Sequence, residues 1–338
     1  MFKKIQNKIV DTFPKTIHVL SDLYNKILPI IKQTQIKKSL IIFFIALLIL
    51  YYPIGALLTH NIVIDKSYEP QVTKPASATI ASISKLLFQE VYNNTWTPSL
   101  PFIFPAYILD NMPSFQQGVL NSTQKTTSIL SIYQKLPSKD SSPLQTAAEL
   151  LKYPSNIWMF SASNQLIPAP SSNSQYRRAR KHLEKYNRLL SENRYEFIPT
   201  PEALQQLFKT IATHLYTVSL SLEDHIRENN GLIDFRSDNI FYQTQGLLYG
   251  YYTILKGINI DYKNIIIDYN LYTPITIVQK ALENGISLSP LIIKNSSPQT
   301  SIGANHLFSI GFYTLKASYL LQQISSKLPS HQPQGNKI

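Results

Sequence analysis

Apolar positions follow two different patterns along this chain. Residues 39–59 carry no charge, and residues 40–50 are apolar throughout. Beyond residue 76 the apolar positions instead return every three or four residues, as in Ile80, Ile83 and Leu87. An uninterrupted apolar run is typical of a membrane-spanning segment, whereas the three-to-four spacing is that of an amphipathic helix. The sequence therefore predicts one transmembrane helix followed by a bundle of helices.

The uncharged run has the length that a bilayer requires. As a helix, residues 39–59 would extend about 30 Å, which matches the hydrocarbon core of a membrane. A buried core helix is the first alternative, but Lys37 and Lys38 flank the run directly. A cleaved signal peptide is the second, but 38 residues precede the run, far more than a short charged leader needs. We therefore expect an uncleaved signal anchor.

Charge along the chain predicts the orientation of this anchor. The formal net charge is +12, and residues 1–38 contribute half of it, with eight lysines against Asp11 and Asp22. Lysines stay on the cytoplasmic side of a membrane. The remainder is then expected in the periplasm of a bacterium, held by its inner membrane. Residues 1–38 are themselves amphipathic, and they either lie on the inner leaflet or form a plain charged leader.

The outer part of the chain is predicted to be mainly α. We expect a stalk at residues 60–75, a helical domain at 76–326 with a possible subdomain break near 167–173, and a disordered tail at 327–338. Apolar positions at helical spacing predict helices around residues 80–91, 115–136, 147–151, 176–190, 204–222, 240–255, 274–285 and 307–324. Only Ile265–Ile267 and Leu291–Ile293 compete as strands, and both are short.

Local signals predict where several of these helices begin and end. Thr200 with Pro201 is a typical helix start. Residues 237–239, Ser-Asp-Asn, offer N-caps for the helix that follows, and Gly257 is expected to end it. Gly246 and Gly250 lie on one face of that helix, so a second helix is expected to approach it closely there.

The motifs that are absent exclude several function classes. There is no cysteine, which excludes disulfide frameworks, thiolate nucleophiles and cysteine-ligated metals. The sequence also lacks a phosphate-binding glycine loop, a dinucleotide fingerprint, a nucleophile elbow and a His-Glu-x-x-His helix. His214 and His225 share a helix face, but surface or capping roles are favoured over metal ligation. We expect no cofactor and no metal.

One helix concentrates positive charge. An apolar stripe through residues 176–190 leaves six cations on the other faces of the helix: Arg177, Arg178, Arg180, Lys181, Lys185 and Arg188. Outside the cytoplasm such a face suits anionic lipid or an acidic envelope polymer. A solvated face without a partner is the alternative that the pattern itself favours. Nucleic acid is not expected, because no aromatic stacking platform accompanies the charge.

Three stretches resemble a known family. They are Trp96-Thr97-Pro98 with the string from Leu109 to Val119, then Phe235-Arg236-Ser237-Asp238-Asn239 with Tyr242 and Gly246, and finally Asn305-His306-Leu307. Together they are similar to a family of bacterial inner-membrane proteins known only as a domain of unknown function, DUF2333. The resemblance implies an N-terminal membrane anchor and a helical domain, and it implies no activity.

The polar residues within these stretches form a candidate site. Asp and Asn side chains at such positions usually cap helices or hold loops. If a polar pocket exists, we expect six residues to converge on it: Asp110, Asn111, Arg236, Asp238, Asn239 and His306.

These observations favour a non-enzymatic envelope protein. The leading hypothesis is an anchored binding or scaffolding module, with membrane lipid as partner through the anchor and another envelope protein or an anionic polymer as partner of the domain. The alternative is a membrane-tethered hydrolase or transferase that uses the Asp/Asn/His set. A deep cleft at that set would favour the enzyme, whereas an exposed apolar patch or a groove beside the basic helix would favour binding.

Overall fold

The computed structural model describes residues 35–134, 142–160, 167–228, 235–290 and 306–329. The chain divides into one unit that ends at Leu57 and a second that begins at Leu58. The expected amphipathic segment, most of the tail and the strand candidate Leu291–Ile293 lie outside the described residues.

The described residues of the first unit belong to one long helix, α2 (Gln35–Thr59), whose last two residues fall in the second unit. Within it, Lys38–Thr59 is long and apolar enough to cross a membrane, and no other helix of the described residues meets that test. Pro53 lies inside the helix, where a missing amide hydrogen bond is tolerated in a membrane segment. The predicted transmembrane helix is thus present as a helix of the required length and composition.

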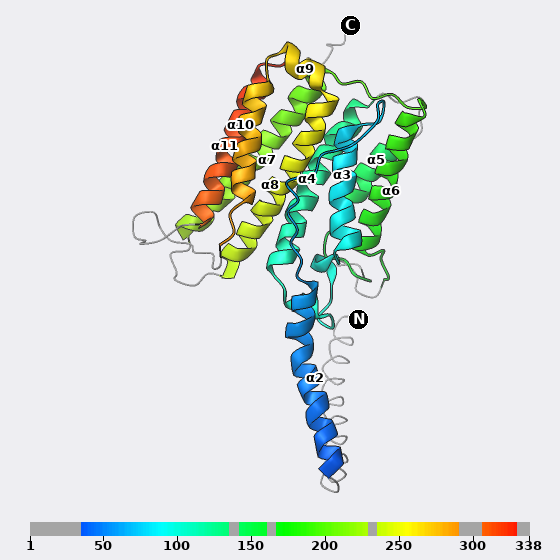
Figure 1. The fold of residues 1–338 in the computed structure, drawn as a ribbon, viewed down its shortest axis with the longest axis vertical. Helices are drawn as coiled ribbons and strands as arrows, with labels where there is room; N and C mark the ends of the chain where they lie inside the picture. The colour runs from blue at the N-terminus through cyan, green and yellow to red at the C-terminus, as the bar shows by residue number, and fades with distance from the viewer. Residues whose placement is uncertain (1–34, 135–141, 161–166, 229–234, 291–305, 330–338) are drawn as a thin grey trace, which may run out of the picture. The chain divides into compact units, whose positions relative to one another are not determined.

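The second unit is a helical bundle, as the periodicity predicts (Figure 1). No strand occurs in the described part of the chain apart from an isolated bridge between Phe160 and Pro168. Its elements are α3 (Ala78–Phe88), the π-helix η1 (Gln89–Asn93), the 3-10 turns η2 (Thr97–Ser99) and η3 (Pro105–Ile108), α4 (Asn111–Tyr133), α5 (Pro143–Leu151), α6 (Ser172–Ser191), α7 (Pro201–Glu228), α8 (Phe235–Asp261), α9 (Lys263–Asp268), α10 (Tyr272–Ile286) and α11 (His306–Ser326).

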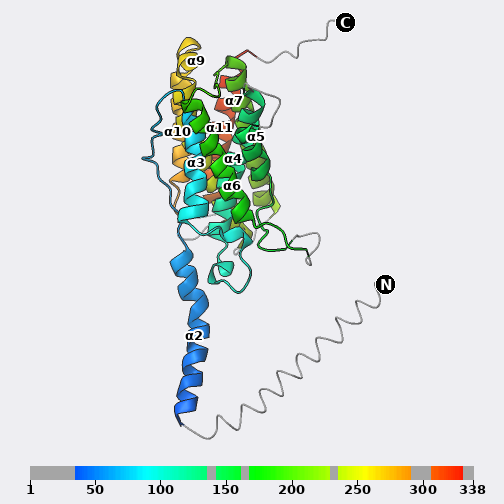
Figure 2. The ribbon, with the colours of Figure 1, turned by 90° about the vertical axis from the view of Figure 1, so that its right-hand side faces the viewer.

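Helices α4 and α8 lie side by side at the centre of the bundle, with α7, α10 and α11 on one flank and α3, α5 and α6 on the other (Figure 1). Seen from the edge, α3 and α10 lie towards one side of the bundle and α5 and α7 towards the other (Figure 2). The large buried side chains, which include Phe115, Tyr249 and Tyr251, fill the space around α4 and α8.

Glycines set the distance between α4 and α8. A Cβ atom on Gly246 would lie 2.0 Å from the carbonyl oxygen of Phe115, and one on Gly118 would lie 2.0 Å from that of Gln243. A Cβ on Gly250 would lie 1.8 Å from the hydroxyl of Ser122. The two backbones therefore touch directly, and the close approach that the sequence predicts at Gly246 and Gly250 is confirmed.

An aspartate at the end of α8 anchors the start of α3. The Asp261 carboxylate accepts hydrogen bonds from the Ala78 and Thr79 amides at 2.8 and 2.9 Å and from the Ser77 hydroxyl at 2.6 Å. A carboxylate at this position satisfies N–H groups that have no partner inside the helix, and it complements the helix dipole. On α6, the Asn187 side chain bonds to the backbone of Ser77. The first turn of α3 thus joins three helices.

Residues 60–75, expected to form a stalk, instead lie along the bundle. The Asp65 amide donates to the Tyr249 hydroxyl at 3.3 Å, and the Gln89 side chain donates to the Val63 carbonyl at 2.9 Å. Lys256 of α8 donates to the carbonyls of Lys66 and Tyr68 and to the Glu69 carboxylate. Residues 60–75, whose prolines and mixed charges suggested a stalk, thus form a segment that side chains of distant helices hold against the bundle.

Two local predictions about helix ends were wrong. Helix α8 begins at Phe235, so residues 237–239 lie in its first turn, and it continues through Gly257 to Asp261. A Cβ on Gly257 would lie 2.6 Å from the Ala78 carbonyl, so this glycine makes room for α3. Ile265–Ile267 belongs to α9, where Ile266 is buried against the bundle.

The expected break near residues 167–173 does not divide the domain. Helices α5 and α6 pack against each other across it, and the Ser172 hydroxyl accepts a hydrogen bond from the Ile157 amide at 2.9 Å. In contrast, the predicted start of α7 is confirmed, since the Ala203 amide donates to the Thr200 hydroxyl at 3.2 Å.

The glycine contacts predict opposite effects for two identical substitutions. Gly246→Ala should lower the free energy of unfolding by about 3 kcal/mol, because its methyl group meets backbone atoms that cannot move independently. Gly311→Ala in α11 should instead raise it by up to ~1 kcal/mol, since alanine favours helix and the new Cβ would meet only the Leu222 side chain at 3.7 Å. Equilibrium unfolding of the full chain in detergent, followed by circular dichroism, measures both, and equal effects would contradict this account of the α4–α8 contact.

Candidate functional site

Helix α6 presents its cations because its opposite face is buried. The Ser171 hydroxyl caps the helix by accepting from the Ser174 amide at 3.2 Å. Tyr176, Ala179, Leu183 and Tyr186 are completely buried on the stripe that the sequence predicts. The six cations of α6 must therefore lie on the remaining faces, where their neighbours decide what each can do.

Two of the six cations are engaged in packing against α3 and η1. Arg177 donates from Nε to the Val91 carbonyl at 2.9 Å, and its guanidinium lies 4.4 Å from the centre of the Tyr92 ring. Arg180 lies over the rings of Phe88 and Tyr92, at 4.6 and 4.8 Å, and pairs with Glu184. Cation–π contacts of this kind hold the arginines in place. These two arginines are therefore less available to a ligand than the sequence suggests.

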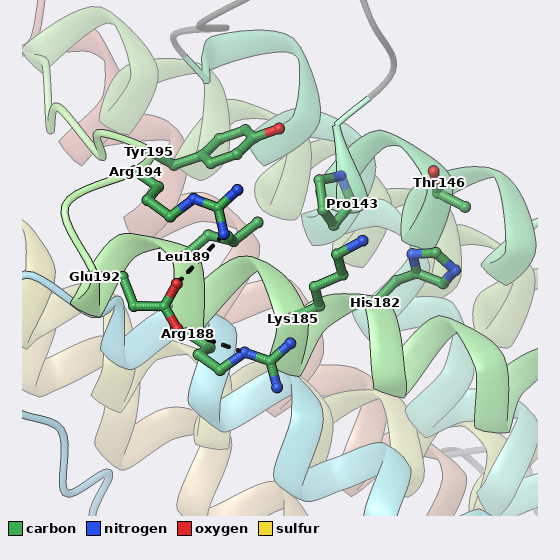
Figure 3. Close-up of a pocket in the computed structure, with 9 residues that line it drawn as sticks. All are labelled: Pro143, Thr146, His182, Lys185, Arg188, Leu189, Glu192, Arg194 and Tyr195. Carbon is green, nitrogen blue, oxygen red and sulfur yellow. Dashed lines mark ion pairs between the residues drawn. The ribbon is translucent and has the colours of Figure 1, made fainter.

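Two others, Lys185 and Arg188, line a cleft of about 450 Å³ beside α6 (Figure 3). The cleft lies between α6, the start of α5 and the turn after α6, and its lining is Pro143, Thr146, His182, Lys185, Arg188, Leu189, Glu192, Arg194 and Tyr195. Arg178 and Lys181 are not part of this lining. We call it the basic cleft, because Lys185, Arg188 and Arg194 outnumber its single carboxylate, Glu192.

Glu192 is shared between the two arginines of the basic cleft. Its carboxylate lies 3.8 Å from Arg188 Nε and 3.6 Å from Arg194 Nη1, on opposite sides in Figure 3. Both arginine side chains are more than two-thirds exposed. Long, exposed ion pairs contribute little free energy. An incoming anion can therefore replace Glu192 at these guanidinium groups at small cost.

His182 adds a neutral polar group to the cleft. Burial, followed by the nearby charges of Lys185 and Arg178, lowers the pKa of its imidazole below the usual value. Its Nδ1 atom is buried and has no hydrogen-bond partner among the described residues. A neutral imidazole can either donate or accept a hydrogen bond, depending on its tautomer. His182 can thus contact a ligand without adding charge.

Arg194 reaches the cleft because the chain reverses after α6, a feature that we did not predict. Asn193 adopts a left-handed conformation with φ of 55°. The Arg194 amide then donates to the Leu189 carbonyl at 2.9 Å. An asparagine directly after an amphipathic helix is a recognisable end signal, so the return of Arg194 towards α6 could have been inferred from the sequence.

The predicted polar cluster lies at the starts of α4, α8 and α11. Asp110 caps α4 by accepting from the Asn111 amide at 2.9 Å, as expected. Burial raises the pKa of Tyr242, and the negative charges of Asp238 and Asp110 raise it further. Side-chain atoms of Asn111, Asn239 and His306 are buried without hydrogen-bond partners among the described residues. That these residues, with Arg236, form one ligand site remains a hypothesis.

The four best-formed cavities of the described residues do not coincide with this cluster. None of the six residues lines any of them. The second, of about 530 Å³, is an apolar groove between α7 and α11 that Leu220, Phe308 and Phe312 line, each more than 40% exposed. Both features that were expected to favour binding, a groove beside the basic helix and an exposed apolar surface, are therefore present.

The two histidines of α7 have hydrogen-bond partners on α8. His214 Nδ1 lies 2.7 Å from the Tyr251 hydroxyl, and burial, aided by Lys125, lowers its pKa to about 4. His225 Nε2 lies 3.4 Å from the Ser237 hydroxyl. Among the described residues, no group of three or more His, Asp or Glu side chains is arranged to hold a metal ion.

A buried carboxyl group at the end of α3 was missed in the sequence. Glu90 is only 3% exposed and lies in the π-helix η1. It accepts a hydrogen bond from Asn94 at 3.4 Å, while its Oε1 has no partner among the described residues. Burial raises its pKa to about 7. A lone glutamate in an apolar helix normally faces water, so the sequence contains no signal for this burial.

The buried network extends from Glu90 to the residues that carry the family resemblance. Gln116 donates to the carbonyls of Glu90 and Thr95 and accepts from both the amide and the hydroxyl of Thr97. Trp96 donates to the Ser155 carbonyl at 2.9 Å. These residues therefore hold the segment between α3 and α4 in a single conformation.

Glu90 predicts a pH dependence of stability with a definite sign. Because the folded pKa is raised from 4.5 to about 7, folding favours the protonated acid. Stability should be highest below pH 4.5 and should fall by roughly 3 kcal/mol by pH 7 on account of this group. In Glu90→Gln that contribution should disappear, so the variant should exceed the wild type at pH 8 by a similar amount. Urea unfolding of both proteins at pH 5 and pH 8 tests this, and parallel pH profiles would count against it.

The comparisons with known proteins identify a family but no activity. Residues 76–234 match the model of a family described as uncharacterized protein conserved in bacteria, DUF2333. No curated protein and no solved structure matches the chain. The first of the three resembling stretches lies inside the matched range, and the stretches that begin at Phe235 and Asn305 lie outside it. Residues 76–234 of the chain are thus similar to the uncharacterized bacterial family DUF2333, the family that the sequence resembles.

Proposed function

We propose that this protein is a membrane-anchored binding module of the bacterial cell envelope, whose basic cleft takes anionic groups of an envelope polymer. The observation that carries the proposal is the basic cleft itself, where three cations surround one weakly paired carboxylate. Arginine side chains bind carboxylate and phosphate groups through two parallel hydrogen bonds. A repeating anionic polymer offers such groups in series, and one of them replaces Glu192.

The cellular location of the helical domain is inferred from the lysines that precede α2. Eight lysines lie before residue 39, and α2 is the helix that is able to cross a membrane. With the lysines in the cytoplasm, the helical domain lies in the periplasm and α2 spans the inner membrane. Anionic polysaccharides and lipid headgroups are the polyanions that the domain meets there.

The alternative is a membrane-tethered enzyme that uses the Asp110 and Asp238 region. Its support is the set of buried side-chain atoms of Asn111, Asn239 and His306 that have no hydrogen-bond partner among the described residues, together with the effect of both carboxylate charges on the pKa of Tyr242. A catalytic site needs space for a substrate beside such groups. Since none of the four cavities in the described residues reaches them, binding at the basic cleft is the better supported function.

Charge-matched variants of α6 test the cleft. Lys185→Gln and Lys181→Gln each remove one positive charge from the same helix, but only Lys185 lines the cleft. Binding is measured with fluorescent polygalacturonate or dextran sulfate. The double variant Arg188→Gln/Arg194→Gln should weaken binding about tenfold, and Lys185→Gln should weaken it by a smaller factor. Lys181→Gln should leave binding nearly unchanged. Glu192→Gln should tighten binding, because the competing carboxylate is gone. Equal losses for Lys181→Gln and Lys185→Gln would show a general charge effect and refute the site.

The orientation has its own test, made simple by the absence of cysteine. In cells with a permeabilised outer membrane, a membrane-impermeant maleimide should label Tyr272→Cys at the exposed start of α10. Lys8→Cys should react only after the inner membrane is disrupted, because its position is cytoplasmic. The reverse pattern of labelling would place the domain in the cytoplasm and remove envelope polymers as partners.

A further inference from the structure

We propose that the apolar surface formed by Phe102, Ile103, Tyr107, Ile108, Met159 and Phe160 inserts into the interfacial layer of the membrane that holds α2. Each of these side chains is between 48 and 67% exposed. Large exposed apolar side chains gathered on one surface usually mark an interaction site. We call this surface the apolar end. Its proposed occupant is lipid.

The apolar end is formed by two loops that touch. One loop, residues 96–109, lies between η1 and α4 and includes η2 and η3, and the other, residues 153–160, follows α5. The rings of Phe104 and Trp158 lie 5.8 Å apart in an edge-to-face contact and join the loops. Trp96 of the first loop also donates to Ser155 of the second. The two loops that carry the six exposed side chains therefore lie against each other.

The backbone beneath these side chains is well satisfied. The amides of Phe104, Tyr107 and Leu109 donate to carbonyls three residues earlier, at 3.0 to 3.1 Å. In the second loop, the Ala169 amide donates to the Met159 carbonyl at 2.9 Å. Unpaired backbone groups are costly in an apolar medium. A loop whose amides are already bonded can enter the interface without losing hydrogen bonds to water.

The composition of both loops suits an interface with lipid. Residues 96–109 and 153–160 contain no charged side chain. Aromatic and aliphatic residues dominate, and aromatic rings are enriched where a bilayer meets water. Protein interfaces, in contrast, usually surround their apolar centre with a polar rim. The absence of charge across both loops favours lipid as the occupant.

The chain enters the helical domain at this same end. Asn61 donates through its side chain to Asn94 at 3.2 Å and through its amide to the Met112 sulfur at 3.4 Å. Asn94 lies two residues before the first loop, and Met112 lies three residues after it. Two residues extend at most about 7 Å, so the covalent chain keeps Asn61 near Thr59, the last residue of α2. This limit comes from the chain alone and holds for any orientation of the helix.

Site-specific fluorescence in a bilayer tests the proposal. The protein lacks cysteine, so Phe102→Cys and Tyr107→Cys can each carry a single environment-sensitive dye. The control is Tyr272→Cys, which replaces an aromatic residue that is 74% exposed at the start of α10, at the opposite end of the bundle (Figure 1). All three positions are exposed, so each variant should retain the far-ultraviolet circular dichroism of the wild type.

Full chains are reconstituted in nanodiscs of phosphatidylethanolamine and phosphatidylglycerol, with and without lipid that carries a spin label near its headgroup. Dyes at positions 102 and 107 should emit at shorter wavelength than the dye at 272, and the labelled lipid should quench them roughly threefold more strongly. Quenching equal to that of the control would overturn the proposal. So would a blue shift without quenching, because it would indicate a protein surface instead of lipid. The basic cleft and the orientation of the anchor do not enter this measurement, so its failure would leave the proposed function untouched.

Discussion

The direct backbone contact between α4 and α8 is the constraint on which the rest of the domain depends. Because Gly118 and Gly246 have no Cβ, the carbonyls of Gln243 and Phe115 lie where side-chain atoms would otherwise be. Helices that approach so closely can neither slide nor rotate without a clash. The remaining helices pack around this pair, and the positions of the basic cleft and of the apolar end are fixed relative to it.

The sequence predicted the helices well, but it predicted their ends only where the end signal is local. A helix with one buried face needs only a core on that side. The apolar stripes of α3, α6 and α7 were therefore sufficient to predict these helices. Thr200 was read correctly because its hydroxyl bonds to an amide three residues away. Gly257 was misread because its role depends on α3, about 180 residues earlier in the chain. The same holds for Asp261, whose carboxylate caps a helix that is remote in sequence.

The concentration of positive charge on α6 could be predicted from the sequence. Which of its cations pack against neighbouring helices, and which line the cleft, could not. All six cations of α6 lie off its apolar stripe, and only the rings of Phe88 and Tyr92 show that Arg177 and Arg180 are engaged in packing. Arg194 and Glu192 line the cleft because the chain turns back after α6. Glu90 was not recognised at all, because nothing in its neighbourhood along the chain shows that Gln116 and Asn94 enclose it. The sequence therefore indicated the helix that lines the proposed site, while the composition of the cleft followed only from tertiary contacts.

The residues that carry the family resemblance have a structural explanation within this chain. Trp96, Thr97 and Gln116 direct their polar atoms inward, to Ser155, to Glu90 and to each other. Within the loop, the amides of Phe104, Tyr107 and Leu109 donate to carbonyls three residues earlier, so the exposed apolar side chains lie on a backbone whose amides are bonded. A motif that builds a charge-free, ordered surface needs no catalytic group of its own. The distinctive sequence of these residues is therefore explained by a surface at the end of the bundle where the chain enters. It does not by itself imply catalysis.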